Sequence, residues 1–593
     1  MRRCLIFALV LLAVPASLAA QTVAILDVGI HGYYTNGTPT RVHLQASNPL
    51  ATAVTLHLEL RIHPKTEPNE QPSRTDTFSQ VVTLQPLETR VFDVPVLIAV
   101  NGEPVLELET RSGGHQTVES RGLGSPNFDG LIVILCADDQ GCRQAEETLS
   151  FGGSPDERAG KLRKFTFLPV TEAPSEWWAY SHVNSVVLAR KPASLTPEQR
   201  FALEGYLRQG GHLFLVESFA ENDPFLAAYR RGKASSQPSP VGFGWLYRFA
   251  ALNSDLATFF APKPDEDDGK QIVVPRFSPA GNTIETARQR LALNFVFPTF
   301  GWLLWWLLGY ILVVGLLNFA LLRKLDRREW GWVTTPAIAV LFALAIYFAS
   351  SAKRPKSVEL DEVAVYTMDE TSPMAAVRVG LRLSSPKRKD LALNVPGDAV
   401  WLGPVGDFVG LFVGEGISFR GRATTEPGWK VGVGPPQHFD LPLLQWSFRD
   451  LDFGSVKQLP GTVRRLGPTQ LVNETGQSFQ DAIYVNEDLV YYLGRVAAGA
   501  TVNLGAARTK SCSDAGLKWE NRPMFMYQET PPSGPFSLLE LVQRWGYDPH
   551  RDHENNAVFL GLSDAPVLGA EITGQPIIHT QHSVVVVSLE SAP

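Results

Sequence analysis

Apolar and polar side chains alternate with a period of two through much of the first 120 residues. The stretches RVHLQASN and AVTLHLELRI show this alternation, and loop-forming stretches such as HPKTEPNEQPSRTD separate the runs. Period-two alternation is typical of strands with one buried face. Several such strands within about 100 residues have the spacing of a β-sandwich. We therefore expect an immunoglobulin-like β-sandwich over residues 22–120.

The pattern changes between residues 126 and 260. The continuous apolar run at 130–136 is typical of a strand buried on both faces, and 183–190 and 212–218 are expected to be further strands. The helix expected between the last two has clear end signals: Thr196 as N-cap, Pro197 in the first turn, Gln199 to complete a capping box, and Gly210 and Gly211 at its end. Its expected apolar face consists of Phe201, Leu203, Tyr206 and Leu207. Strand, helix and strand predict a βαβ unit, and hence an α/β domain with a parallel sheet over 126–260.

Two long runs contain no charged residue, at 297–322 and 331–352. Each is long enough to cross the hydrocarbon layer as a helix, and both carry aromatic residues near their ends, as interfacial belts do. A buried soluble hairpin is the alternative. We expect Asn318 to form a helix–helix hydrogen bond and Pro336 to occupy a first turn. Neither run holds an ionisable side chain, which argues against an ion or proton path.

The segment 323–330 between these runs carries four cations, Arg323, Lys324, Arg327 and Arg328. A short, strongly basic loop between two spans is a positive-inside signal, so we expect it to be cytoplasmic. The cations at 353–356 after the second run argue weakly for the opposite orientation.

Residues 1–20 have the pattern of a secretory signal peptide: an n-region with Arg2 and Arg3, an apolar h-region, and small residues at Ala19 and Ala20. An uncleaved N-terminal anchor is the alternative, and either places the following chain outside the cytoplasm. Together with the basic loop, this predicts a bacterial inner (cytoplasmic) membrane protein with most of its chain extracytoplasmic.

After a linker at 261–296 and the two spans, residues 357–593 return to strand patterns, with one amphipathic helix expected at 537–547. The predicted fold class is therefore a multidomain α+β membrane protein. It has a β-sandwich, a parallel-sheet α/β domain, two transmembrane helices and a β-rich C-terminal extracytoplasmic region.

Composition and charge argue against one class of partner. The net charge is −7, and the chain has 49 Gly and 43 Pro against 5 Met, as in a turn-rich β protein. A basic nucleic-acid surface is not suggested, so we expect no nucleic acid partner. Cys136 and Cys142 are close enough in sequence for a small-loop disulfide in an oxidising compartment, which would leave Cys512 unpaired.

The strand at 183–190, the helical stretch LTPEQRFALEGYLRQGG and the strand HLFLVES together resemble the class I glutamine-amidotransferase-like domains of bacterial membrane proteins. The whole chain resembles a family of uncharacterised bacterial envelope proteins with a β-sandwich, this α/β domain, a transmembrane hairpin and a β-rich C-terminal portion. LNFALLRKLDRREWGWVTTPAIAV and LVNETGQSFQDAIYVNEDLVYYLGRVAAGATVNLG carry that likeness best. The family implies no settled activity.

The chain departs from true amidotransferases at the nucleophile. Those enzymes place a Cys in a G-x-C-x-G elbow with a later His and Glu, whereas Cys136 and Cys142 lack both flanking glycines and no His-x-Glu follows within the domain. Activation of a thiolate also needs a base or another positive environment. We therefore expect a domain without a catalytic residue.

Other candidate sites are weaker. Asp138 and Asp139 follow one strand and Glu217 and Ser218 follow another, and with Cys136 they would line a pocket at the end of a parallel sheet. Solvated loop carboxylates with capping roles are the alternative. The histidine clusters HRDHE (550–554) and HTQH (579–582) lack the convergent ligands of a zinc site, and the second would point to opposite faces of a strand. We expect neither metal nor cofactor.

The leading functional hypothesis is a non-catalytic, membrane-anchored envelope protein whose extracytoplasmic domains bind a protein or glycan partner. A second hypothesis is a membrane-anchored hydrolase or amidotransferase-like enzyme that uses Cys136, Asp138 and Glu217. A third is an auxiliary subunit of an exporter, which would copurify with an ATPase because this chain has no Walker loop.

Overall fold

The computed structural model describes most of the chain from Thr22 to Glu590. The described residues are 22–34, 37–65, 75–99, 104–110, 115–119, 130–149, 163–189, 195–216, 239–242, 244–249, 300–325, 328–351, 357–397, 399–404, 428–434, 436–444, 447–486, 489–515, 538–539, 556–565, 567–574 and 577–590. The proposed signal peptide, the linker 261–296 and nearly all of the helix expected at 537–547 lie outside them.

The N-terminal strands form two facing sheets. The first contains β1 (Thr22–Val28), β2 (Pro39–Ser47) and β5 (Thr89–Leu97), all antiparallel. The second begins with β3 (Val54–Pro64), β4 (Asp76–Leu84), β6 (Pro104–Thr110) and β7 (His115–Glu119). The period-two pattern explains the layering, because alternate residues such as Val42, Leu44 and Ala46 are fully buried between the sheets.

The second sheet continues into the part of the chain that follows the hairpin. Strand β4 pairs in parallel with β18 (Lys430–Gly432), which places Thr77 opposite Lys430. The sheet then extends through β19 (Gln437–Leu443), β16 (Lys389–Val395) and β28 (Glu571–Ile572) to eight strands. The N–H of Trp429 also donates to Asp76 Oδ1 at 2.9 Å, in a buried position. Segments on both sides of the hairpin therefore share one sheet.

A nine-stranded sheet packs against this one. Its order is β17 (Val400–Pro404), β20 (Ser447–Gln458), β15 (Ser372–Ser385), β14 (Val358–Asp369), β29 (Ile577–Glu590), β27 (Asn556–Ser563), β23 (Asp481–Asn486), β24 (Leu489–Tyr492) and β26 (Arg508–Ser511). A small sheet of β21 (Val463–Arg465), β22 (Gln470–Asn473) and β25 (Thr501–Asn503) lies beside it, with the short helix η8 (Leu504–Ala506).

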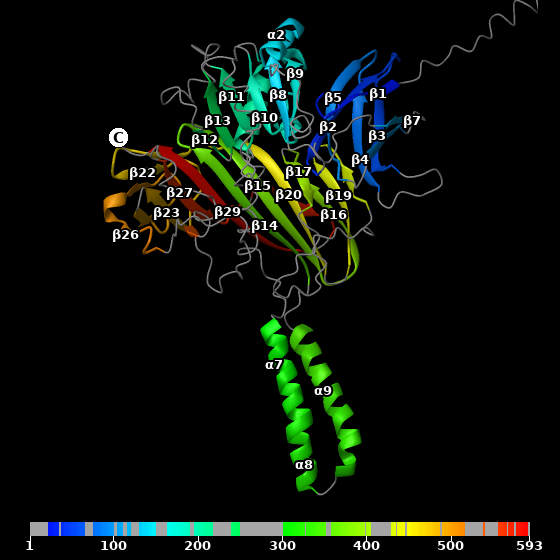
Figure 1. The fold of residues 1–593 in the computed structure, drawn as a ribbon, viewed down its shortest axis with the longest axis vertical. Helices are drawn as coiled ribbons and strands as arrows, with labels where there is room; N and C mark the ends of the chain where they lie inside the picture. Colours follow the sequence, from blue (N-terminus) through cyan, green and yellow to red (C-terminus); the bar gives the residue numbers. More distant parts are fainter. Residues whose placement is uncertain are drawn as a thin grey trace, which may run out of the picture.

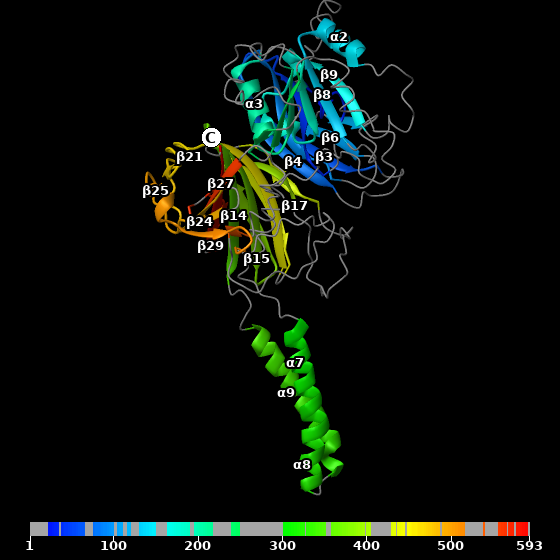
Figure 2. The same cartoon turned by 60° about the vertical axis from the view of Figure 1, so that its left-hand side comes forward.

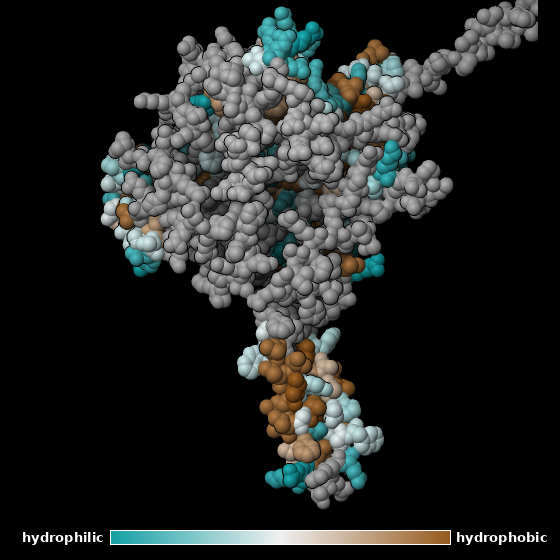
Figure 3. Space-filling model, viewed as in Figure 1, coloured by the Kyte–Doolittle hydropathy of each residue, from teal (hydrophilic) through white to brown (hydrophobic). Residues whose placement is uncertain are grey.

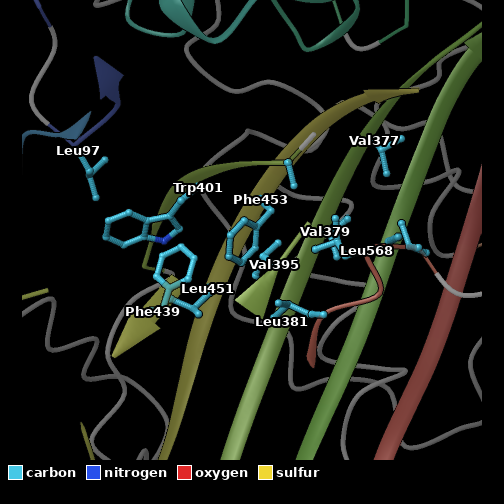
Figure 4. Packing of buried hydrophobic residues seen from close by; sticks show 14 of the residues in the cluster. Leu97, Val377, Val379, Leu381, Val395, Trp401, Phe439, Leu451, Phe453 and Leu568 are labelled. Carbon is cyan, nitrogen blue, oxygen red and sulfur yellow. The ribbon is translucent and has the colours of Figure 1, made fainter. Parts of the chain in front are cut away.

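One hydrophobic core joins these layers. Figure 4 shows Leu97 of the N-terminal strands near Trp401, with Phe439 of β19 and Phe453 of β20 meeting between the sheets. The Phe439 and Phe453 rings lie 5.5 Å apart, edge to face. The same core contains Leu44 and Leu60 from before the hairpin, so the β strands form one body (Figure 1).

A six-stranded sheet lies at the end of the β body away from the hairpin, beside the N-terminal strands (Figures 1 and 2). Its order is β12 (Ser239–Val241), β13 (Gly244–Phe249), β11 (His212–Val216), β10 (Ser185–Leu188), β8 (Gly130–Cys136) and β9 (Arg163–Pro169). All neighbouring pairs are parallel except β12 with β13. Helix α2 (Asp139–Leu149) packs on β8 and β9, and α3 (Pro197–Arg208) covers the opposite face.

Helix α3 has the predicted ends. Gln199 N–H donates to Thr196 Oγ1 at 3.2 Å and Thr196 N–H donates to Gln199 Oε1 at 3.0 Å, which confirms the capping box. The helix ends before Gly210, whose φ of 111° suits glycine. The predicted apolar face was wrong at Phe201, which is 45% exposed, while Ala202 is fully buried.

Two helices extend from the base of the body as a hairpin (Figure 1). They comprise α7 (Phe300–Ile311), the π-helical turn η6 (Leu312–Leu317) and α8 (Asn318–Lys324), then η7 (Arg328–Trp330) and α9 (Gly331–Ser351). Segments Leu304–Lys324 and Gly331–Ala349 are long and apolar enough to cross a membrane. Figure 3 shows their hydrophobic surface between the body and a polar tip.

The hairpin differs from expectation in two places. Helix α8 runs to Lys324, so Arg323 and Lys324 lie in its last turn, where cations complement the helix dipole, rather than in the loop. Pro336 lies inside α9 and not in its first turn, because the helix already begins at Gly331. The predicted helix–helix hydrogen bond is confirmed: Asn318 Nδ2 lies 3.4 Å from Thr335 Oγ1. Arg327 lies outside the described residues.

Candidate functional site

The end of β8 holds the residues singled out for a pocket. Cys136 is the last residue of β8 and forms a disulfide with Cys142 in the first turn of α2, with Cα atoms 5.1 Å apart. Both cysteines are buried, at 1% and 8% exposed. In this state the Cys136 sulfur is bonded to sulfur and offers no thiolate.

The neighbouring carboxylates have structural roles. Asp138 Oδ1 accepts a hydrogen bond from Gly141 N–H at 2.8 Å, and Cys142 N–H donates to the Asp138 carbonyl oxygen. Asp138 thus supports the first turn of α2, which Asp139 begins. Glu217 and Ser218 lie outside the described residues. The structure therefore brings Cys136, Asp138 and Asp139 to one strand end and says nothing of the other half of the expected pocket.

An aromatic cluster lies on the α2 face of this sheet. The rings of Phe214 and Tyr247 stack with centroids 4.3 Å apart, and His212 Nδ1 lies 3.2 Å from the Tyr247 hydroxyl. Burial lowers the pKa of His212 to about 4 and raises the pKa of Tyr247 to about 12. Both groups are therefore neutral near pH 7, as befits a packed core.

The most strongly built polar feature is the junction between α3 and the nine-stranded sheet. The Arg208 side chain is fully buried; its Nη1 lies 2.7 Å from Asp369 Oδ2 at the end of β14, and its Nε lies 3.0 Å from Glu204 Oε1. Gly205 permits this approach, because a Cβ there would lie 2.7 Å from Trp177 Cβ and 3.2 Å from Val456 Cγ2 of β20.

Neighbouring polar groups complete the junction. Gln209 Nε2 donates to the carbonyl oxygens of Val377 on β15 and Ser455 on β20, at 3.2 and 2.6 Å. Arg378 Nη2 donates to the Gln209 carbonyl at 3.1 Å, and burial lowers the pKa of Arg378 to about 10. The buried guanidinium groups of Arg208 and Arg378 keep their partners only in this arrangement. The junction therefore favours one position of α3 relative to the nine-stranded sheet.

The N-terminal part of the chain contacts the six-stranded sheet on another side. Ile30 is fully buried within the core beneath β8, β10 and α3, and His31 Nδ1 lies 3.2 Å from Thr166 Oγ1 on β9. Arg41 of β2 lies 3.9 Å from both Asp27 and Asp93. Burial, and then the Arg41 charge, lower the pKa of nearby His182 to about 3. The six-stranded sheet is therefore fixed between two parts of the β body.

The HTQH histidines separate as their spacing predicts. His579 Nε2 lies 3.3 Å from the buried Glu362 Oε2, whereas His582 Nδ1 lies 3.0 Å from Asp564 Oδ1. Near the second pair, burial raises the pKa of Asp361 to about 6. Among the described residues no three His, Cys, Asp or Glu side chains are placed to hold a metal ion. The HRDHE cluster lies outside those residues.

Sequence reasoning missed the Arg208–Asp369 junction. Arg208 looked like an ordinary cation in a last helical turn, and Asp369 is 161 residues away. The one available signal was Gly205 within an otherwise strong helix pattern, since an interior glycine there often marks close packing.

Comparison with known proteins assigns no family. No protein-family model and no curated protein matches the chain. Among solved structures, an alkylpurine DNA glycosylase of Pseudomonas fluorescens bound to DNA aligns at 12% identity and TM-score 0.14, over 17% of this chain and 30% of that one. The yeast delta-COP-I mu-homology domain complexed with a Dsl1 peptide aligns at 7% identity and TM-score 0.17. The alignment covers 40% of this chain and 96% of that one. A Paenibacillus cycloisomaltooligosaccharide glucanotransferase aligns at 10% identity and TM-score 0.15. The alignment covers 72% of this chain and 70% of that one. These scores are too low to relate the folds.

Proposed function

We propose that this chain is a non-catalytic, membrane-anchored envelope protein whose body outside the membrane binds a protein or glycan partner. The observation that carries the proposal is the pairing of β4 with β18. It joins residues from before and after the helical hairpin in one sheet and one core, which suits a rigid scaffold held by a single anchor.

The same pairing supports the proposed topology. Strands that share hydrogen bonds lie on the same side of a bilayer, so the chain would cross it twice and return. The cations Arg323, Lys324 and Arg328 near the hairpin tip then favour a cytoplasmic tip and an extracytoplasmic body, by the positive-inside rule. The bacterial inner membrane and the signal peptide at 1–20 belong to this proposal.

The topology of the six-stranded sheet is compatible with the expected amidotransferase-like α/β domain. Counting its parallel strands along the chain, their spatial order is 2-1-3-4-5, that of doubly wound α/β domains that bind ligands at the strand ends. At that edge the disulfide occupies both Cys136 and Cys142. Because the Cys136 and Cys142 sulfurs are bonded to each other, a binding role is favoured over hydrolase or amidotransferase chemistry that uses Cys136.

Copurification from native membranes in mild detergent tests the proposal. Deleting 126–260 is a poor variant, because it would expose Ile30 and would leave Asp369 without Arg208. Instead, R143E/E146R reverses exposed charges on α2, and R464E/E474R exchanges the exposed Arg464–Glu474 pair as a matched control.

A scaffold predicts a specific partner that copurifies with wild type and with C136A/C142A. Loss of that partner in R143E/E146R, but not in the control, would map it to the α/β unit. Absence of any specific partner of the wild type would refute the binding function. An associated ATPase would favour the exporter-subunit alternative, and an activity lost in C136A/C142A would favour the enzyme.

A further inference from the structure

The end of the β body from which the hairpin emerges carries a distinct surface, which we call the basal rim. It consists of Lys387 and Arg388 in the β15–β16 turn, Lys389 at the start of β16, the exposed Leu444 after β19, and Ile578 on β29. Lys387 and Arg388 are exposed, Leu444 is 60% exposed and Ile578 is 52% exposed. The rim thus combines cations with outward apolar side chains.

Strand register places these residues together at one end. Glu359, the second residue of β14, pairs with Ser384 on β15 and with Ile578 on β29. Lys389 pairs with Leu443, so Leu444 lies beside the basic turn. In Figures 1 and 2, β14 and β15 extend to the end of the body from which the hairpin emerges.

Chain length holds this end near the membrane. Helix α9 ends at Ser351 and β14 begins at Val358. At about 3.6 Å per residue the connection spans no more than about 25 Å. Because the start of β14 pairs with the end of β15, the β15–β16 turn lies at the same end of the sheet. Wherever the hairpin is embedded, the basal rim lies within reach of the bilayer surface.

We propose that the basal rim docks on an anionic lipid surface and holds the body in a fixed orientation over its anchor. This inference rests on the membrane anchorage in the proposed function. Lys387, Arg388 and Lys389 against the exposed Asp390 leave residues 387–390 with a net positive charge. Leu444 and Ile578 supply the apolar contacts that interfacial segments place among headgroups.

The β15–β16 turn is held by hydrogen bonds to the main chain of Lys387. Ser385 Oγ donates to the Lys387 carbonyl oxygen at 2.7 Å and accepts from Lys387 N–H at 3.4 Å. The variant K387S/R388S should therefore keep the turn. R508S/K510S is the matched control, because Arg508 is in register, across the sheet, with Thr367 near the opposite end of β14.

The test uses the full chain in bilayers of phosphatidylcholine with or without phosphatidylglycerol. An environment-sensitive fluorophore on L444C, with C512S, reports entry into the headgroup layer. We expect a blue shift that requires phosphatidylglycerol and weakens with salt. Each basic residue near an anionic surface contributes about fivefold to such an equilibrium, so K387S/R388S should reduce the docked-to-undocked ratio about 25-fold, and R508S/K510S should not.

A blue shift that ignores phosphatidylglycerol, or one that both double variants change equally, overturns the docking proposal. Resistance to alkaline extraction separates this failure from failure of the anchor. A protein that stays in the bilayer without lipid-dependent docking loses only this inference, whereas release of the wild type refutes the anchor and the docking together.

Discussion

Arg208 at the end of α3 and Asp369 at the end of β14 form a buried ion pair, with Nη1 and Oδ2 2.7 Å apart. The pair ties the six-stranded sheet to the strand that begins just after the membrane hairpin. Removing Asp369 takes one of two carboxylate partners from the buried Arg208 guanidinium, and this loss costs more than the pair itself contributes.

Asp369→Asn should therefore weaken the junction by about 3 kcal/mol, seen as faster hydrogen exchange of α3 amides. The control is Glu474→Gln in the exposed pair with Arg464, where the expected loss is below about 1 kcal/mol. Equal effects of the two substitutions would show that Arg208 does not depend on Asp369.

The Cys136–Cys142 disulfide should act as a staple within the α/β unit. It closes a short loop, so C136A/C142A should lower the free energy of unfolding by about 2 kcal/mol, chiefly through the entropy of the unfolded chain. Chemical unfolding in mild detergent, with and without reductant, measures this. Reductant should shift the unfolding midpoint of the wild type and leave that of the variant unchanged. A reductant-dependent shift in the variant would show that the effect does not come from this disulfide.

His212 should make the protein less stable in acid. Burial lowers its folded pKa to about 4, whereas an unfolded histidine titrates near 6.5, so between these values the unfolded state binds more protons. The free energy of unfolding then falls as pH drops from about 6.5 to about 4, by up to roughly 3 kcal/mol. His212→Gln should flatten this slope in unfolding titrations; an unchanged slope would contradict the assignment.

Asp361 should act with the opposite sign. Burial raises its folded pKa to about 6, from 3.8, so its contribution is present below pH 3.8 and is lost as pH rises through 6. Asp361→Asn should therefore be more stable than the wild type above pH 6, by about 2 kcal/mol, and lose this advantage near pH 4. The exposed Asp390→Asn serves as control; a wild type more stable than D361N at pH 8 would refute the account.

Local features were predictable where the sequence itself encodes them. The strand Gly130–Cys136 and the capping box of Thr196 and Gln199 appear as expected, because the first shows as a continuous apolar run and the second joins residues three apart. The pairing of β4 with β18 was not predictable. Strand β18 has only three residues, too few to show a period, and its partner lies about 350 residues earlier.

The candidate site was predictable only in part. The spacing of Cys136 and Cys142 favoured the bond that the structure contains, while the buried contacts of Arg208 and Glu362 needed the tertiary arrangement. Buried charges gave no signal, since in sequence they resemble solvated ones.

The central claim is that chain segments before and after the hairpin form one body on one side of the membrane. A disulfide between T77C and K430C tests it most directly, because these residues are paired across β4 and β18 and Lys430 is exposed. In full-length protein in native membranes, with C512S, we predict that the cross-link forms on mild oxidation, and that T77C paired with K389C gives none. Absence of the T77C–K430C cross-link, with the two cysteines labelled by impermeant reagent from opposite sides, would contradict the account.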